Sequence, residues 1–163
     1  MINIVLVEPE IPQNTGNIVR TAAATGSVVH LVRPLGFDTS DKTLKRAGLD
    51  YWKDCEIHYW DSFSQLQQAH PDGNYFYFST KAQKCHCQVT YGDNAYLVFG
   101  RESRGLPEQL VHDNYDKAVR IPMIADTRSL NLSNSVAIAV YEVLRQHNFE
   151  GMNFIGHLRE FDD

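Results

Sequence analysis

Short runs of apolar, β-branched and aromatic residues recur along the chain, and each has the length of a buried strand. The runs are Ile2–Val7, Val28–Val32, Tyr75–Phe78, Ala95–Phe99 and Ala118–Ile121. Segments with helical periodicity separate or follow several of them, at Asn14–Thr25, Ser40–Ala47, Asp61–Ala69, Pro107–Val111 and Ser133–Gln146. This order predicts an α/β fold with a mostly parallel sheet and helices on both faces.

The length of the chain suits one domain. Its 163 residues are enough to bury roughly 70 % of the unfolded surface, so a core needs no disulfide or metal. There is no internal repeat, low-complexity stretch or long linker, and Pro-Asp-Gly-Asn at 71–74 reads as a surface turn. We expect a single domain over residues 1–150 and a C-terminal tail over residues 151–163.

Composition bears on location and on partners. Three cysteines and the lack of an apolar stretch of membrane length predict a cytoplasmic protein without a membrane partner. A net charge of −5 argues against indiscriminate nucleic-acid binding. DNA is not expected as a partner. Basic residues are nevertheless concentrated between Arg33 and Lys53 and again at Lys81, Lys84, Arg101 and Arg104. Solvated surface is an equally good interpretation of any one of these charges.

The first strand-to-helix turn carries polar residues where nucleotide-binding turns carry glycines or lysine. Pro12 ends the extended segment, and Asn14 is expected to cap the following helix. On a helical projection Ile18, Val19, Ala22 and Ala23 form the core stripe. Arg20 faces away from that stripe, so an exposed surface arginine is its simplest interpretation.

A second turn, at 99–107, joins a buried strand to a short helix. Its sequence, Phe-Gly-Arg-Glu-Ser-Arg-Gly-Leu-Pro, lacks the lysine of a phosphate-binding loop and the spacing of a dinucleotide fingerprint. Glycine permits close approach of a ligand, but without lysine it does not favour a triphosphate. An ordinary strand-to-helix turn is the alternative.

The last helix has two stripes. Its main stripe is apolar and consists of Val136, Ala137, Val140, Val143 and Leu144. A second, mixed stripe consists of Asn134, Ile138, Tyr141 and Arg145. A mixed stripe beside a core stripe suits a partner subunit, and plain surface exposure is the simpler alternative.

Three stretches, in this order, resemble the three motifs of the SPOUT methyltransferases. They are NTGNIVR at 14–20, FGRESRGLP at 99–107 and RSLNLSN at 128–134. Within the TrmH-like class the chain is most similar to the single-domain tRNA 2′-O-methyltransferases that modify the wobble nucleotide. The similarity runs from Asn3 to about Phe149 and includes PLGF at 34–37 and KRAGLDYW at 45–52.

The resemblance implies S-adenosylmethionine as methyl donor, no metal, a homodimer and a C-terminal trefoil knot. It also implies methylation of the ribose of a wobble cytidine or 5-carboxymethylaminomethyluridine in leucine tRNAs. Carried over residue by residue, the cofactor pocket includes Phe78, Gly100, Gly105, Ile121, Ser129 and Leu130. A sulfonium cofactor has no phosphates, which explains why these turns carry glycines and amides without a lysine.

By the same resemblance, Arg20 lies beside the target ribose. A free guanidinium loses its proton only above about pH 12 and is a poor base. Two roles stay open: base, after deprotonation helped by an RNA phosphate, or clamp on that phosphate. Asn14 either fixes the turn or contacts the ribose, and Glu102 and Asn131 are expected to hold the loops together. The sequence departs from the family's pattern at two positions. Some relatives have proline in place of Arg101, and leucine is common in place of Phe78.

The sequence also allows other interpretations. Cys85-His86-Cys87 resembles a metal cluster, but three consecutive residues do not easily close a tetrahedral site and no second Cys or His pair has suitable spacing. A non-catalytic RNA-binding module, an enzyme acting on another tRNA or rRNA position, and an enzyme for a different nucleotide-like molecule are the functional alternatives. The presence of Arg20 favours a catalytic enzyme over the non-catalytic RNA-binding module.

Overall fold

The computed structural model describes all residues except 41, 43–45, 47–49, 125–128 and 162–163. Strands within the described residues form one sheet in the order β3-β2-β1-β6-β4-β7-β5, and every neighbouring pair is parallel. Their bounds are Ile2–Val7 (β1), Val28–Val32 (β2), Ile57–Trp60 (β3), Asn74–Phe78 (β4), Lys84–Cys85 (β5), Ala95–Phe99 (β6) and Ala118–Arg120 (β7). The predicted α/β fold with a parallel sheet is confirmed.

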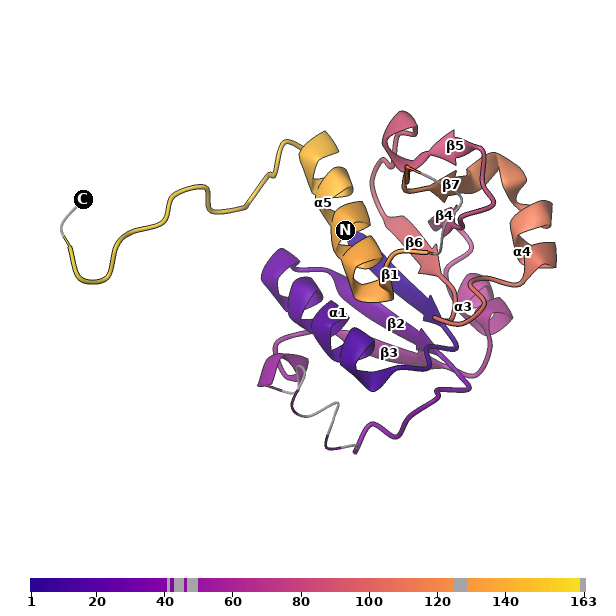
Figure 1. Ribbon diagram of the computed structural model, residues 1–163, viewed down its shortest axis with the longest axis horizontal. Helices are drawn as coiled ribbons and strands as arrows, with labels where there is room; N and C mark the ends of the chain where they lie inside the picture. Colours follow the sequence, from indigo (N-terminus) through magenta and orange to yellow (C-terminus); the bar gives the residue numbers. More distant parts are fainter. Residues whose placement is uncertain (41, 43–45, 47–49, 125–128, 162–163) are drawn as a thin grey trace.

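Helices cover both faces of the sheet, as predicted. Their bounds are Pro12–Thr25 (α1), Phe63–Ala69 (α3), Glu108–Asp113 (α4) and Leu132–Gln146 (α5), with 3₁₀ turns at His86–Gln88 (η1) and Tyr115–Lys117 (η2). Figure 1 shows α1 and α5 side by side on one face of the sheet. Within β1, Ile4 and Leu6 belong to the core under these helices, whereas Val5 and Val7 belong to the core on the α3 and α4 side. Successive strand residues thus fill opposite layers.

Two strands were not predicted from the apolar pattern. β3 lies at one edge of the sheet and its residues are half-buried or exposed, so it lacks a continuous apolar run. β5 has two residues and pairs with β7 at the other edge. The helix expected over Ser40–Ala47 falls largely on residues outside the described part of the chain.

The start of α1 differs from the prediction. Asn14 was expected to cap the helix, but the helix begins at Pro12 and Ile11 takes the cap position without a side-chain hydrogen bond. Proline suits the first helical position because it has no N–H to satisfy there. Asn14 lies inside the first turn and is buried.

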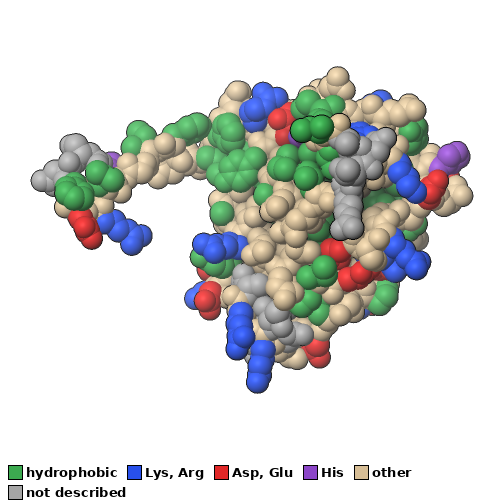
Figure 2. Space-filling view, in the orientation of Figure 1, with side chains coloured by type: hydrophobic (Ala, Val, Ile, Leu, Met, Phe, Trp, Pro, Cys, Tyr) green, Lys and Arg blue, Asp and Glu red, His purple; other side chains and the backbone are tan. Residues whose placement is uncertain are grey.

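After α5 the chain continues without helix or strand over residues 152–161 and reaches away from the sheet (Figure 1). Several large apolar side chains are exposed there, as Figure 2 shows. They are Phe154, Ile155, Leu158 and Phe161. Phe149 connects the tail to α5, since its ring lies 6.0 Å from that of Phe154 and 6.5 Å from that of Tyr141. No helix in the described part of the chain is long and apolar enough to cross a membrane.

A buried hydrogen-bond chain links the strands at the sheet's β3 side. Trp60 donates its indole N–H to His30 Nδ1 at 3.0 Å, which leaves the proton of the neutral ring on Nε2. His30 Nε2 lies 3.0 Å from Asn3 Oδ1, and the Asn3 amide donates to Asn94 Oδ1 at 3.2 Å. Burial, and then the neighbouring His58 and His70, lower the pKa of His30 from 6.5 to about 3.

We predict that His30 makes the fold acid-sensitive. Below pH 6.5 the unfolded chain protonates this histidine and the folded chain does not, so stability falls as the pH drops from 6.5 toward 3. Near pH 5, His30 lowers the free energy of unfolding by close to about 1.4 kcal/mol for each pH unit that the pH falls. His30→Gln keeps one donor and one acceptor and should flatten the slope in urea unfolding between pH 7 and pH 5.

The matched control for this prediction is His112→Gln, which changes an exposed histidine. Its slope should equal that of the unmodified protein. Equal slopes for the His30→Gln protein and the unmodified protein would contradict the assignment.

Candidate functional site

A pocket of about 550 Å³ lies at the carboxyl ends of β4, β6 and β7. The turn after each strand contributes to its wall: residues 78–81, 99–106, and 121 with 123. The segment 129–132, which leads into α5, and the start of α1 at Ile11 and Asn14 also line it, as do Glu108, Val111 and Ser135. Parallel α/β sheets place ligands at this edge, beside strands whose connections diverge.

The pocket collects most of the residues singled out from the sequence. All six predicted cofactor residues line it, namely Phe78, Gly100, Gly105, Ile121, Ser129 and Leu130. Asn14 lines it as well, and Arg20 does not. The aromatic rings of Phe78 and Phe99 stack at 4.5 Å where β4 and β6 end, which fixes the pocket's inner wall to the sheet.

Glu102 joins the turn after β6 to the start of α1. One carboxylate oxygen accepts the backbone N–H of Glu10 at 2.7 Å, and the other accepts that of Ile11 at 3.1 Å. The Asn14 amide also donates to Glu102, at 3.3 Å. The carboxylate thus satisfies backbone donors at the helix entry, where negative charge is favourable.

Asn131 extends this network to α5. Its amide donates to Asn14 Oδ1 at 3.0 Å, and its own oxygen accepts the backbone N–H of Ser133 and of Asn134 as the N-cap of α5. Both polar ends of the Asn14 side chain are therefore engaged within the protein. These contacts favour fixing the turn over contacting a ribose as the role of Asn14, and they give Glu102 and Asn131 the loop-holding role expected of them.

The turn after β6 folds back tightly on itself. A Cβ at Gly100 would lie 2.0 Å from the carbonyl carbon of Gly105, so no side chain fits there. Gly105 has φ +69° and donates its N–H to the Arg101 carbonyl at 2.7 Å. The absence of a side chain at Gly100 is needed by the chain's own backbone, and clearance for a ligand at Gly105, which the resemblance implies, stays a prediction.

Charged side chains at the pocket mouth are mostly paired. Arg101 contacts Glu8 and lies 3.9 Å from Glu10, while Lys81 lies 2.5 Å from Glu108 and lowers the pKa of that carboxyl. Arg104 also lines the pocket and has no ion-pair partner among the residues that the structure describes. The positive charge that the sequence places here is largely neutralised.

Arg20 lies elsewhere on α1. It is exposed, as its place off the core stripe predicted, and its guanidinium lies 5.1 Å from the ring centre of Tyr51. Arg20 is six positions after Asn14, which corresponds to about 9 Å along a helix and about 120° around it. Arg20, which the resemblance places beside the target ribose, and Asn14, for which contact with the ribose was one of two expected roles, therefore lie on different sides of α1.

The rule that ligands bind at the carboxyl ends of parallel strands predicts a pocket formed by the loops after Tyr75–Phe78, after Phe99 and from Ile121 to Leu132. The turn at 79–81 and Met123 belong to these loops and line the pocket. The contribution of Ile11 to the lining, and the contacts of Glu8 and Glu10 with Arg101, were not predicted. No local pattern marks the partners of Arg101.

Comparison with known proteins agrees with this geometry. The profile of the SpoU rRNA Methylase family matches residues 1–141. The chain belongs to the SpoU methylase family. Its pocket-forming turns all lie within the matched range.

Individual relatives are similar over nearly their whole length. The tRNA (cytidine(34)-2′-O)-methyltransferase of Saccharophagus degradans is 50 % identical over 155 residues, which are 93 % of this chain and 99 % of the relative. A solved structure that describes 2′-OH methylation of C/U34 on tRNA is 45 % identical, with a TM-score of 0.86, and covers 92 % of this chain and 98 % of its own. The AviRb methyltransferase of Streptomyces viridochromogenes, solved with AdoMet, shares the fold at 20 % identity and a TM-score of 0.81, over 90 % of this chain and 57 % of its own.

We predict that Gly100→Ala destabilises this family member by at least about 2 kcal/mol, because the methyl group would force the Gly105–Leu106 backbone to move. Urea unfolding at pH 7 measures the loss. Gly156→Ala, at a glycine with open space around it, is the matched control and should leave stability unchanged. Equal midpoints for the two variants would show that the turn is not tightly closed.

Proposed function

We propose that the protein transfers a methyl group from S-adenosylmethionine to the ribose 2′-hydroxyl of the wobble nucleotide of tRNA. The target is a cytidine or 5-carboxymethylaminomethyluridine in leucine isoacceptors. The observation that carries the proposal is the pocket in which all six expected cofactor residues meet. Whole-length similarity to an enzyme named for nucleotide 34 of tRNA supports the substrate.

The pocket's chemistry fits S-adenosylmethionine. Its volume lies within the range of about 300–1,000 Å³ usual for small-molecule sites. Phe78, Ile121 and Leu130 supply apolar surface, and Ser129 and Asn131 supply polar groups. Among the described residues that line the pocket, Lys81 is the one lysine, and its ammonium is paired with Glu108 and not free for a phosphate. When bound, the sulfonium supplies the methyl group for transfer.

The protein's part in transfer is to orient the acceptor and to handle its proton. The hydroxyl must approach in line with the sulfonium, and its proton must leave. Arg20 is proposed to act on the ribose side, as clamp on a neighbouring phosphate or as base once that phosphate favours its deprotonation. Asn14 is proposed to hold the turn. A ribose seated between the pocket and the exposed side of α1 would contact both regions.

A homodimer through α5 is the second part of the proposal. Asn134, Ile138, Tyr141 and Arg145 are all exposed, and Ile138 and Tyr141 expose 40 % and 47 % of their surface. A twofold pairing along this stripe would bury them and double the surface available to tRNA. Phe149 and Phe154 extend the apolar surface beyond Tyr141.

Other expectations stay predictions. These are the trefoil knot, the single-domain boundary at residue 150, the cytoplasmic location, and the absence of metal and of DNA among the ligands. A non-catalytic RNA-binding module and action on another tRNA or rRNA position are the competing functions. Methyl transfer to purified tRNA would exclude the module.

We predict that Arg20→Ala abolishes methyl transfer and leaves S-adenosylmethionine affinity unchanged. Its side chain is exposed and off the pocket, so truncation should cost only about 0.5 kcal/mol of stability. Arg20→Lys should also be strongly impaired, because an ammonium cannot grip a phosphate bidentately. Single-turnover methylation with labelled cofactor at saturating tRNA measures the rate, and calorimetric titration measures cofactor affinity.

The matched control is Arg33→Ala. Arg33 is also an exposed arginine against a tyrosine, 5.2 Å from the ring centre of Tyr59, but it lies after β2. This variant should keep its rate at saturating tRNA. Full activity of Arg20→Ala would refute the role of Arg20, and no binding heat at millimolar cofactor would refute the pocket.

We further predict that Ile138→Glu converts a dimer into a monomer, because a dimer would bury the introduced charge without a partner. Sedimentation velocity at micromolar concentration gives the mass. Gln68→Glu, an exposed position on α3, is the control and should remain dimeric. A monomeric unmodified protein that still methylates tRNA would contradict the interface.

A further inference from the structure

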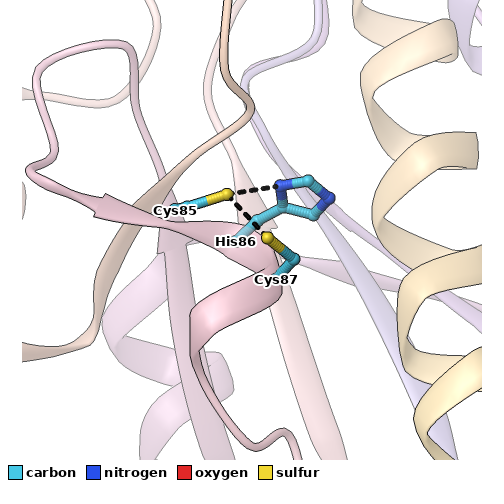
Figure 3. Close-up of side chains that lie close together, drawn as sticks. All are labelled: Cys85, His86 and Cys87. Carbon is cyan, nitrogen blue, oxygen red and sulfur yellow. Dashed lines mark hydrogen bonds between the residues drawn. The ribbon is translucent and has the colours of Figure 1, made fainter.

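A cluster of two thiols and an imidazole lies at the β5 edge of the sheet, apart from the pocket lining. Figure 3 shows the side chains of Cys85, His86 and Cys87 turned toward one another. The Sγ atoms of Cys85 and Cys87 are 2.9 Å apart, and Cys85 Sγ is 3.7 Å from His86 Nδ1. Closing a disulfide of about 2.05 Å would require the two sulfur atoms to approach by only about 0.9 Å.

Local hydrogen bonds distinguish the two thiols. Cys85 Sγ accepts the backbone N–H of Gln88 at the start of η1. The hydrogen bond with Cys85 is the main reason why the pKa of Cys87 is raised. Cys85 is half-buried and Cys87 is exposed. The arrangement suits Cys85 as first nucleophile and Cys87 as resolving thiol.

A shallow hollow of about 390 Å³ adjoins Cys85. Gln83, Gln88 and Arg120 contribute polar side chains to it. Arg120 is the register partner of Cys85 across β5 and β7, and it has no ion-pair partner among the residues that the structure describes. The neighbouring Lys84 donates to the Asp116 carbonyl at 2.6 Å. A small anionic ligand would find a cation in this hollow next to a thiol.

We propose that Cys85 and Cys87 form a redox-active dithiol that exchanges with an anionic low-molecular-weight disulfide, of which oxidised glutathione is the probe. The Cys85 thiolate attacks one sulfur of the external disulfide, whose S–S bond breaks and releases one thiolate. Cys87 then loses its proton to water and attacks Cys85 Sγ, which releases the second thiolate. The protein loses two electrons and two protons, and the external disulfide becomes two thiols. Arg120 binds a carboxylate of the incoming molecule.

A dithiol site accounts for the cluster better than a metal site does. The three ligand atoms come from consecutive residues, and the described residues supply no fourth histidine, cysteine or carboxylate to the group. Structural zinc requires four protein ligands. A ring closed over one intervening residue is strained, and strained disulfides are readily reduced. Exchange at this site should therefore be reversible.

The test is intact-mass analysis of the folded protein after incubation with oxidised glutathione and a chelator. The unmodified protein should lose about 2 Da, and reduced glutathione should restore the original mass. Cys87→Ser lacks the resolving thiol and should instead retain one glutathione. Cys55→Ser should behave like the unmodified protein, because Cys55 is half-buried and burial raises its pKa to about 11.

Arg120→Gln tests recognition separately from thiol chemistry. It should slow oxidation by glutathione several-fold and leave oxidation by cystamine, a cationic disulfide, unchanged. Thermal melting should show that each variant remains folded. A stable glutathione adduct on the unmodified protein, or an unreactive Cys87→Ser, would overturn the dithiol. Reactivity that depends on the chelator would establish a metal site in its place, and equal slowing with both disulfides would overturn the role of Arg120.

Discussion

The pocket depends on the carboxylate of Glu102. It accepts two backbone N–H groups at the entry to α1 and one from the Asn14 side chain, so it ties the turn after β6 to the turn after β1. Hydrogen bonds to a charged group contribute about 1.5–3 kcal/mol each, and removing the carboxylate would leave these donors unsatisfied. Through Asn14 and Asn131 the same network sets the start of α5. Three segments distant in sequence thus form one wall.

This constraint explains the residue types in the family's motifs. The Asn14 amide donates to Glu102 with its nitrogen and accepts from Asn131 with its oxygen, so it joins the two turns. Gly100 is required because the backbone of Gly105 passes within contact distance. The motif residues Asn14 and Gly100 therefore serve mainly to hold together the turns after β1 and β6. The pocket is the space that these turns enclose at the ends of β4, β6 and β7.

Much of the fold and pocket could be predicted from the sequence. Strands buried on both faces carry continuous apolar runs, which located β1, β2, β4, β6 and β7. β3 and β5 were not predicted, because these edge strands lack a continuous apolar run and β5 has only two residues. The pocket was located both by the resemblance of the motifs and by the loops that follow the predicted strands. The resemblance assigned Glu102 and Asn131 to holding the loops together, but their pairing with Asn14 could not be predicted, since hydrogen bonds across 88 and 117 residues leave no local pattern.

The central claim is that this pocket serves ribose methylation at the tRNA wobble position. The most direct measurement is mass mapping of modified nucleosides in tRNAs from cells with the gene, without it, and with it restored. We predict that a 2′-O-methyl group at nucleotide 34 of leucine tRNAs disappears with the gene and returns with the unmodified protein, but not with Arg20→Ala. Unchanged methylation at nucleotide 34, or loss at another position, would contradict the assignment.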